Sequence, residues 1–149
     1  MTKIMFDSNA FSRLIDANLN QRDFFSKCTE KYEFYVSAVQ VEELAQIGDH
    51  KKERRIQHML CLCQMRAKLV DTLAVLGYAR LGLCVVGGEE ESTYHRLLTA
   101  TKRNVKDAMI GELAQREGCI LITDDTRFAS KLKSESIHTM TFQEFCDSL

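Results

Sequence analysis

Short apolar stretches alternate along the chain with longer stretches that have apolar residues at helical spacing. Residues 3–6, 34–36 and 119–122 are short, apolar and bounded by polar residues, which favours buried strands. Residues 137–140 predict a last strand, and residues 83–86 predict either a strand or a helical turn. Four or five short strands are therefore expected, spread over the whole chain.

The stretches between them predict helices, because their apolar residues recur at intervals of three and four. Several begin or end at typical capping residues: Ser37 and Thr141 fit N-caps, whereas Gly48 and Gly118 fit helix ends. The helices expected on this basis cover residues 10–17, 24–28, 38–47, 50–69, 105–116 and 127–132, and a closing helix follows Thr141.

Strands that alternate with helices indicate an α/β fold with a short, mostly parallel sheet covered by helices on both faces. The chain of 149 residues contains no internal repeat, low-complexity tract or linker, so residues 1–149 are interpreted as a single domain.

Composition places this domain in the cytoplasm. The chain lacks an apolar run near the roughly 18 residues of a membrane span, and no secretory signal is recognised. Six cysteines lie mostly among apolar neighbours and are interpreted as reduced, buried thiols. They are Cys28, Cys61, Cys63, Cys84, Cys119 and Cys146.

The net charge of −1 argues against a protein that holds nucleic acid by bulk charge alone. Divalent cations or a local basic strip would be needed. The sequence KKERR at residues 51–55 is either a solvated helix face or part of a basic rim. The other cations of such a rim would be Arg66, Lys68, Lys102, Arg103 and Lys106.

Acidic residues follow two of the predicted strands. Asp7 comes directly after residues 3–6, and Asp124 and Asp125 follow residues 119–122. Asp107 lies at the start of a helix and Glu43 one turn into another. Taken singly, such residues are typically helix caps or solvated positions. Taken together at the carboxyl edge of a parallel sheet, they predict a carboxylate cluster, which persists mainly when a hard cation neutralises it.

Other kinds of site have weaker support. His58, Cys61 and Cys63 do not form a zinc-ligand set, because Cys61 and Cys63 are two residues apart on a predicted helix and point in different directions. Neither a Gly-rich phosphate loop nor a serine nucleophile elbow is present. A haloacid-dehalogenase-like phosphatase remains an alternative, although Asn9 stands where its second Asp would be.

Four segments together resemble the PIN-domain family in the expected order. KIMFDSNAF resembles its first strand and turn, and FYVSAVQVEEL resembles its strand–Ser–helix segment. KDAMIGELAQREGCILITDDTRF resembles the segment with the third acid, a strand and a Thr-x-Asp-x-x-Phe motif, and IHTMTFQEF resembles the last strand and helix. Residues 50–106 match no family pattern.

The resemblance implies an endoribonuclease that uses Mg²⁺ or Mn²⁺. Its acids would be Asp7, Glu43 rather than Glu42, Asp107 and Asp125, and Asp124 would be a further candidate metal ligand. Small bacterial members are often toxins of VapBC-type toxin–antitoxin pairs, so the resemblance also implies a cognate antitoxin and a homodimer. A non-catalytic PIN-like domain that binds RNA or protein is the remaining alternative.

Overall fold

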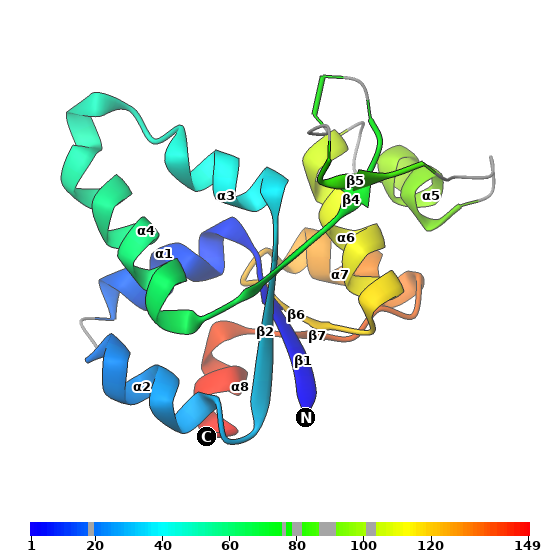
Figure 1. Ribbon diagram of the computed structural model, residues 1–149. Coiled ribbons are helices and arrows are strands. Elements are labelled where there is room, and N and C mark those ends of the chain that lie inside the picture. The colour runs from blue at the N-terminus through cyan, green and yellow to red at the C-terminus, as the bar shows by residue number, and fades with distance from the viewer. Residues whose placement is uncertain (18–19, 76, 79–81, 87–91, 101–103) are drawn as a thin grey trace.

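A five-stranded parallel sheet forms the centre of the molecule in the computed structural model, which describes residues 1–17, 20–75, 77–78, 82–86, 92–100 and 104–149 (Figure 1). The strand order is β3-β2-β1-β6-β7, and each neighbouring pair is parallel. The strands are β1 (Thr2–Phe6), β2 (Tyr32–Ser37), β3 (Lys68–Val70), β6 (Ile120–Ile122) and β7 (Thr139–Met140). The prediction of an α/β fold with a mostly parallel sheet is confirmed.

Alternate residues of the strands enter two separate cores. Ile4 and Phe6 of β1 belong to one apolar cluster, whereas Met5 between them belongs to the other. Leu121 and Ile122 of β6 divide in the same way. This is the two-residue period of a strand that is buried on both faces. The sheet therefore needs a layer of helices on each side.

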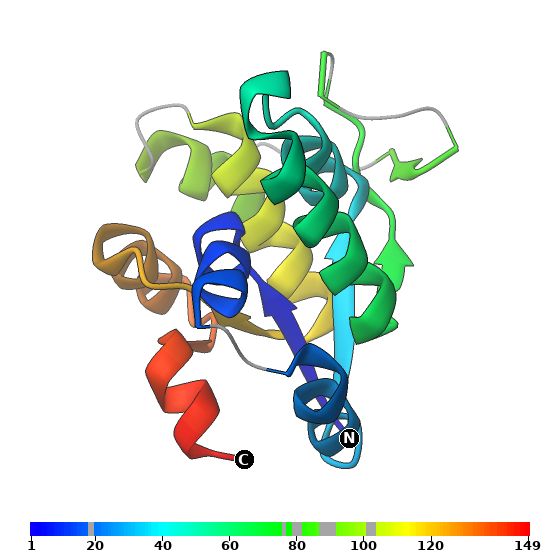
Figure 2. The same cartoon turned by 90° about the vertical axis from the view of Figure 1, so that its left-hand side faces the viewer.

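Helices supply both layers, as predicted (Figures 1 and 2). The core with Phe6 also takes buried residues from α1 (Ser8–Asp16), α2 (Gln21–Cys28), α4 (Lys52–Met65) and α8 (Phe142–Asp147). The core with Met5 takes them from α5 (Thr93–Ala100), α6 (Val105–Glu117) and α7 (Thr126–Ser134). The helix α3 (Ala38–Ala45) contributes Val39 to the second core and Leu44 to the first.

Gly111 allows the close packing of the second layer. It lies on α6, where an added Cβ would come within 2.5 Å of Leu97 Cδ1 and 2.9 Å of Leu132 Cδ2. Leu97 belongs to α5 and Leu132 to α7, so a side chain at Gly111 would force the side chains of both leucines to shift. The glycine lowers helix propensity slightly but lets three helices meet.

The predicted helix ends are partly right. Ser37 and Thr141 form capping boxes with Gln40 and Glu144, and Gly118 ends α6 in the left-handed conformation with φ of 66°. The prediction that Gly48 closes α3 is wrong, because the helix already ends at Gln46.

The prediction of one helix over residues 50–69 is also wrong. Residues 49–51 form the short 3₁₀ helix η1 (Asp49–Lys51), and α4 ends where Arg66 adopts a left-handed conformation with φ of 52°. The chain then enters β3, which pairs with β2. A second, two-stranded parallel sheet follows, formed by β4 (Thr72–Leu73) and β5 (Cys84–Val85). The strand alternative for residues 83–86 is thereby confirmed.

All six cysteines are free thiols. Cys28, Cys61 and Cys119 are buried and Cys84 and Cys146 are half-buried, as the sequence predicted, but Cys63 is exposed because it lies on the outer face of α4. No helix in the described part of the chain is long and apolar enough to cross a membrane.

Candidate active site

Asp7 is the buried centre of the acidic site. Its backbone N–H donates to the carbonyl of Ile122 over 2.9 Å, which fixes the residue at the end of β1 beside β6. Its carboxylate Oδ1 accepts a hydrogen bond of 2.7 Å from the Ser8 amide at the start of α1. Only 8% of the residue is exposed to solvent. Asp7 is thus both the N-cap of α1 and a carboxylate at the carboxyl edge of the sheet.

Thr123 joins this carboxylate to the neighbouring strand end. Its hydroxyl donates to Asp7 Oδ2 over 2.9 Å and accepts from the Asp125 amide over 3.1 Å. Asn9 also donates to this hydroxyl, over 3.4 Å from its Nδ2 to Thr123 Oγ1. The Thr123 hydroxyl thus positions the turn that carries Asp125.

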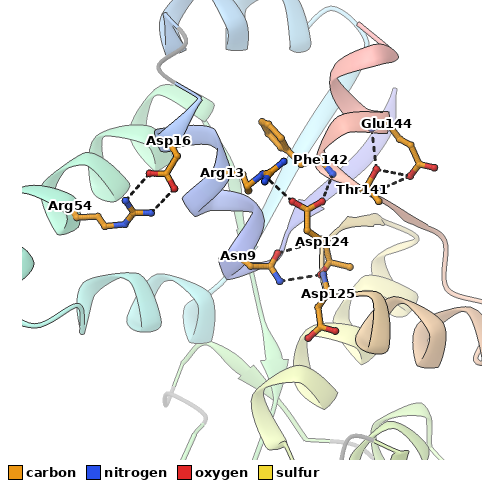
Figure 3. Close-up of polar contacts among 10 residues, drawn as sticks. Asn9, Arg13, Asp16, Arg54, Asp124, Asp125, Thr141, Phe142 and Glu144 are labelled. Atoms are coloured by element: carbon orange, nitrogen blue, oxygen red, sulfur yellow. Dashed lines mark hydrogen bonds and ion pairs between the residues drawn. The ribbon is translucent and has the colours of Figure 1, made fainter.

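Asp124 and Asp125 are adjacent in sequence, but their carboxylates point in different directions (Figure 3). Asp125 Oδ1 accepts hydrogen bonds of 2.9 Å from the amides of Arg127 and Phe128, so Asp125 is the N-cap of α7. Asp124 Oδ1 accepts one of 3.0 Å from the Phe142 amide at the start of α8. Asp124 Oδ2 lies 3.3 Å from Arg13 Nε, in an ion pair that lacks hydrogen-bond geometry.

The two acids therefore have different structural roles. Asp125, and not Asp124, is the cap of α7. Asp124 instead connects β6 to α1 through Arg13 and to α8 through the Phe142 amide.

Glu43 reaches the site from α3. The start of α3 is fixed to the end of β1 by Gln40, whose Nε2 donates to the Phe6 carbonyl over 2.7 Å. The Glu43 carboxylate accepts a hydrogen bond of 2.6 Å from Ser8 Oγ, next to Asp7. Its other oxygen lies 3.1 Å from the ammonium of Lys106 on α6. Neighbouring Glu42 accepts a hydrogen bond from Gln46 instead.

Asp107 lies in the first turn of α6. Asn104, the N-cap of that helix, accepts from the Asp107 amide over 3.3 Å and donates through Nδ2 to Asp107 Oδ2 over 2.6 Å. The sequence reasoning did not single out Asn104, although an Asn three residues before an acid at a helix start is a typical capping pattern.

The charges of neighbouring acids act on Asp107 and Asp7. Burial, followed by the charges of Asp7, Asp125 and Glu43, raises the pKa of Asp107 from 3.8 to about 6. Burial also raises the pKa of Asp7, and the charges of Glu43 and Asp125 add to that rise, whereas hydrogen bonds from Thr123 and Ser8 oppose it. Mutual repulsion of this kind requires that the four carboxylates lie near one another.

Their chemistry fits a hard cation, although they are not gathered around one point. Among the described residues, no group of three or more His, Cys, Asp or Glu side chains is arranged to hold a metal ion. Glu43 is turned toward Ser8 and Lys106, and Asp107 toward Asn104. Oxygen ligands from several carboxylates are what Mg²⁺ and Mn²⁺ prefer.

The other candidate residues do not join the site, apart from Lys106. Cys61 is buried and Cys63 exposed, so the zinc alternative has no geometric support. Two cations of the possible basic rim pair with acids outside the site: Arg54 pairs with Asp16 and Lys68 with Glu33. Lys102 and Arg103 lie outside the described residues.

The fold and the site together define an α/β protein with an acidic cluster at the carboxyl edge of a parallel sheet, the arrangement of a nuclease-type fold. The family model of the PIN domain matches residues 4–132. The chain therefore belongs to the PIN-domain family, whose members are in general metal-dependent nucleases. A comparison with curated proteins found no match.

Proposed function

We propose that this protein is an endoribonuclease that depends on Mg²⁺ or Mn²⁺ and hydrolyses RNA phosphodiesters. The observation that carries the proposal is the placement of Asp7, Glu43 and Asp125 near Asp107, where their charges add to burial in raising the Asp107 pKa. These side chains come from the ends of β1 and β6 and from α3 and α6, and a structural role explains only some of them. Asp7 and Asp125 cap helices, but neither Glu43 nor Asp107 does.

Asp7, Glu43, Asp107 and Asp125 would hold the cation. When bound, the cation supplies an activated water and stabilises charge on the phosphate during in-line displacement. Thr123 holds the Asp7 carboxylate and the Asp125 backbone in place. Lys106 neutralises Glu43 and offers a positive charge next to the acids, where a substrate phosphate would approach. Asp124 is the weaker candidate ligand, because its carboxylate is occupied by Arg13 and the Phe142 amide.

A cleavage assay tests this proposal. Single-stranded RNA should be cut by the purified protein in Mn²⁺ or Mg²⁺, and excess chelator should abolish the cut. Cleavage that persists in chelator would contradict the metal-dependent mechanism. No cleavage in either metal would instead favour the non-catalytic binding alternative.

A biological role follows as a further part of the proposal: the toxin of a type II toxin–antitoxin system, held inactive by a cognate antitoxin and assembled as a homodimer. Expression of the chain alone should then arrest growth, and co-expression of the protein encoded by a neighbouring small open reading frame should restore it. Growth unaffected by the active nuclease would contradict the toxin role and leave the chemistry unaffected.

A further inference from the structure

A groove runs beside the acidic site, between α1, α3, α4 and α6. Its volume is about 330 Å³, and its lining includes Ser12, Gln46, Ile47, His58 and Lys106. Ser8 and Glu43, which belong to the acidic site, also line it. The groove therefore reaches the acidic site at Glu43, and its volume falls within the range of small-ligand sites.

The walls of the groove are fixed. The helices α1 and α4 lie side by side on this face of the molecule (Figure 2). The Arg54 guanidinium on α4 makes two hydrogen bonds, of 2.8 and 3.1 Å, with the two carboxylate oxygens of Asp16 on α1 (Figure 3). A bidentate pair of this kind constrains orientation as well as distance. This pair connects the two helices beside the groove.

His58 presents a hydrogen-bond acceptor to this groove. Its Nδ1 lies 2.7 Å from the Arg54 carbonyl, which can only accept, so Nδ1 carries the proton. In the neutral ring Nε2 is then an acceptor, and burial favours the neutral ring because it lowers the His58 pKa. The protein donor nearest to Nε2 is the Ser12 hydroxyl at 3.5 Å, which is long for a hydrogen bond. A ligand hydroxyl or amino group would be a better donor.

The remaining lining residues suit a nucleotide. Leu44 and Ile47 provide an apolar wall, and the exposed Gln46 amide offers both a donor and an acceptor at the rim. Lys106 lines the groove and pairs with Glu43, so its ammonium is placed to bind a phosphate. An apolar wall, an amide, a buried acceptor and a cation match the base, the ribose and the phosphate of one nucleotide unit.

We propose that this groove binds the nucleotide next to the phosphodiester that is cut, with Ser12, Gln46 and His58 as its specificity-determining residues. The inference rests on the proposed function, because it places the substrate relative to the acidic site. Its test is a binding measurement in chelator, which does not depend on cleavage.

The experiment measures the Kd of a fluorescently labelled six-nucleotide single-stranded RNA by anisotropy at low salt. Ser12→Leu fills the groove and Gln46→Ala removes the amide, and neither changes the net charge. Gln143→Ala is a matched control, because both glutamines are exposed and donate to an acidic side chain four residues away on their own helix. Ser134→Leu, at the far end of α7 from Asp125, is the control for Ser12→Leu.

We expect about a tenfold rise in Kd for each groove variant and less than a twofold change for each control. Groove variants that bind like the wild type would overturn the proposal, and so would a wild type that does not bind this RNA. A wild type that binds the RNA through the groove but does not cleave RNA in Mn²⁺ would overturn only the proposed function.

A reporter variant keeps the proposal testable if a groove variant fails to fold. The chain contains no tryptophan, so Ile47→Trp places a single indole in the groove wall. RNA should quench its fluorescence by stacking, whereas Leu69→Trp, on the exposed edge strand β3, should not respond. RNA that binds to Ile47→Trp without quenching its fluorescence would overturn the proposal.

Discussion

The hydroxyl of Thr123 donates a hydrogen bond of 2.9 Å to the carboxylate of Asp7, although 116 positions separate the two residues in the sequence. Both side chains are buried, and the same hydroxyl accepts from the Asp125 amide. One small side chain thus links the ends of β1 and β6 and sets the distance between two of the four acids.

Replacing Thr123 by Val keeps the shape and removes this link. Asp7 Oδ2 would then lose a buried donor, so we expect the free energy of unfolding to fall by about 1–3 kcal/mol, as measured by urea denaturation at pH 8. Thr123→Ser should recover most of the loss, because it keeps the hydroxyl. Equal stability of the Val and Ser variants would contradict the role assigned to the hydrogen bond.

Asp107→Asn should stabilise the metal-free protein at neutral and higher pH. The pKa of Asp107 is raised from 3.8 to about 6, so between these values the folded state keeps a proton that the unfolded state has lost. The free energy of unfolding therefore falls as the pH rises through this window. Two pKa units correspond to at most about 3 kcal/mol, and partial exposure reduces this, so we expect a gain of about 1 kcal/mol at pH 8.

The measurement is urea denaturation of wild type and Asp107→Asn in chelator at pH 4 and pH 8. The two proteins should be nearly equal at pH 4, where Asp107 is protonated in the folded wild type, and should differ at pH 8. A difference that does not change with pH would show that the repulsion between carboxylates is not its cause.

Asp124 and Asp125 should differ in their effect on catalysis. Asp125→Asn removes a charge that acts on both Asp7 and Asp107, whereas the Asp124 carboxylate faces Arg13 and the Phe142 amide. At saturating Mn²⁺ we expect Asp125→Asn to slow turnover by a factor of about 100 or more, which corresponds to about 3 kcal/mol in the barrier. Asp124→Asn should slow turnover less than tenfold. A larger loss for Asp124→Asn would reverse the assignment of the two acids.

The sequence alone was enough to predict four of the five strands of the central sheet. The strands β1, β2 and β6 are buried on both faces, so their apolar runs are continuous, and capping residues mark the helices that follow them. The edge strand β3 was missed because Lys68 and Leu69 are exposed and continue the helical spacing of α4. Only the left-handed Arg66 ends that helix, and an arginine gives no sequence signal for such a conformation.

The placement of Asp7 and Asp125 at one edge of the sheet was predictable, since strand ends in a parallel sheet point to one edge. The partners of the acids were not. The contacts of Lys106 with Glu43 and of Arg13 with Asp124 join elements that are far apart in the sequence, and they depend on rotamers that no local pattern encodes. The choice between Asp124 and Asp125 was open in the sequence for this reason.

Cleavage of single-stranded RNA by wild type, Asp7→Asn and Asp23→Asn in Mn²⁺ tests the central claim most directly. Asp7 lies at the centre of the carboxylate site, whereas Asp23 is an exposed acid on α2 that accepts a hydrogen bond from Asn20. Asp7→Asn conserves the shape and the acceptor for the Ser8 amide, so it should fold and cleave RNA about 100-fold more slowly or worse, while Asp23→Asn should match the wild type. Undiminished cleavage by folded Asp7→Asn would contradict the metal-dependent carboxylate mechanism.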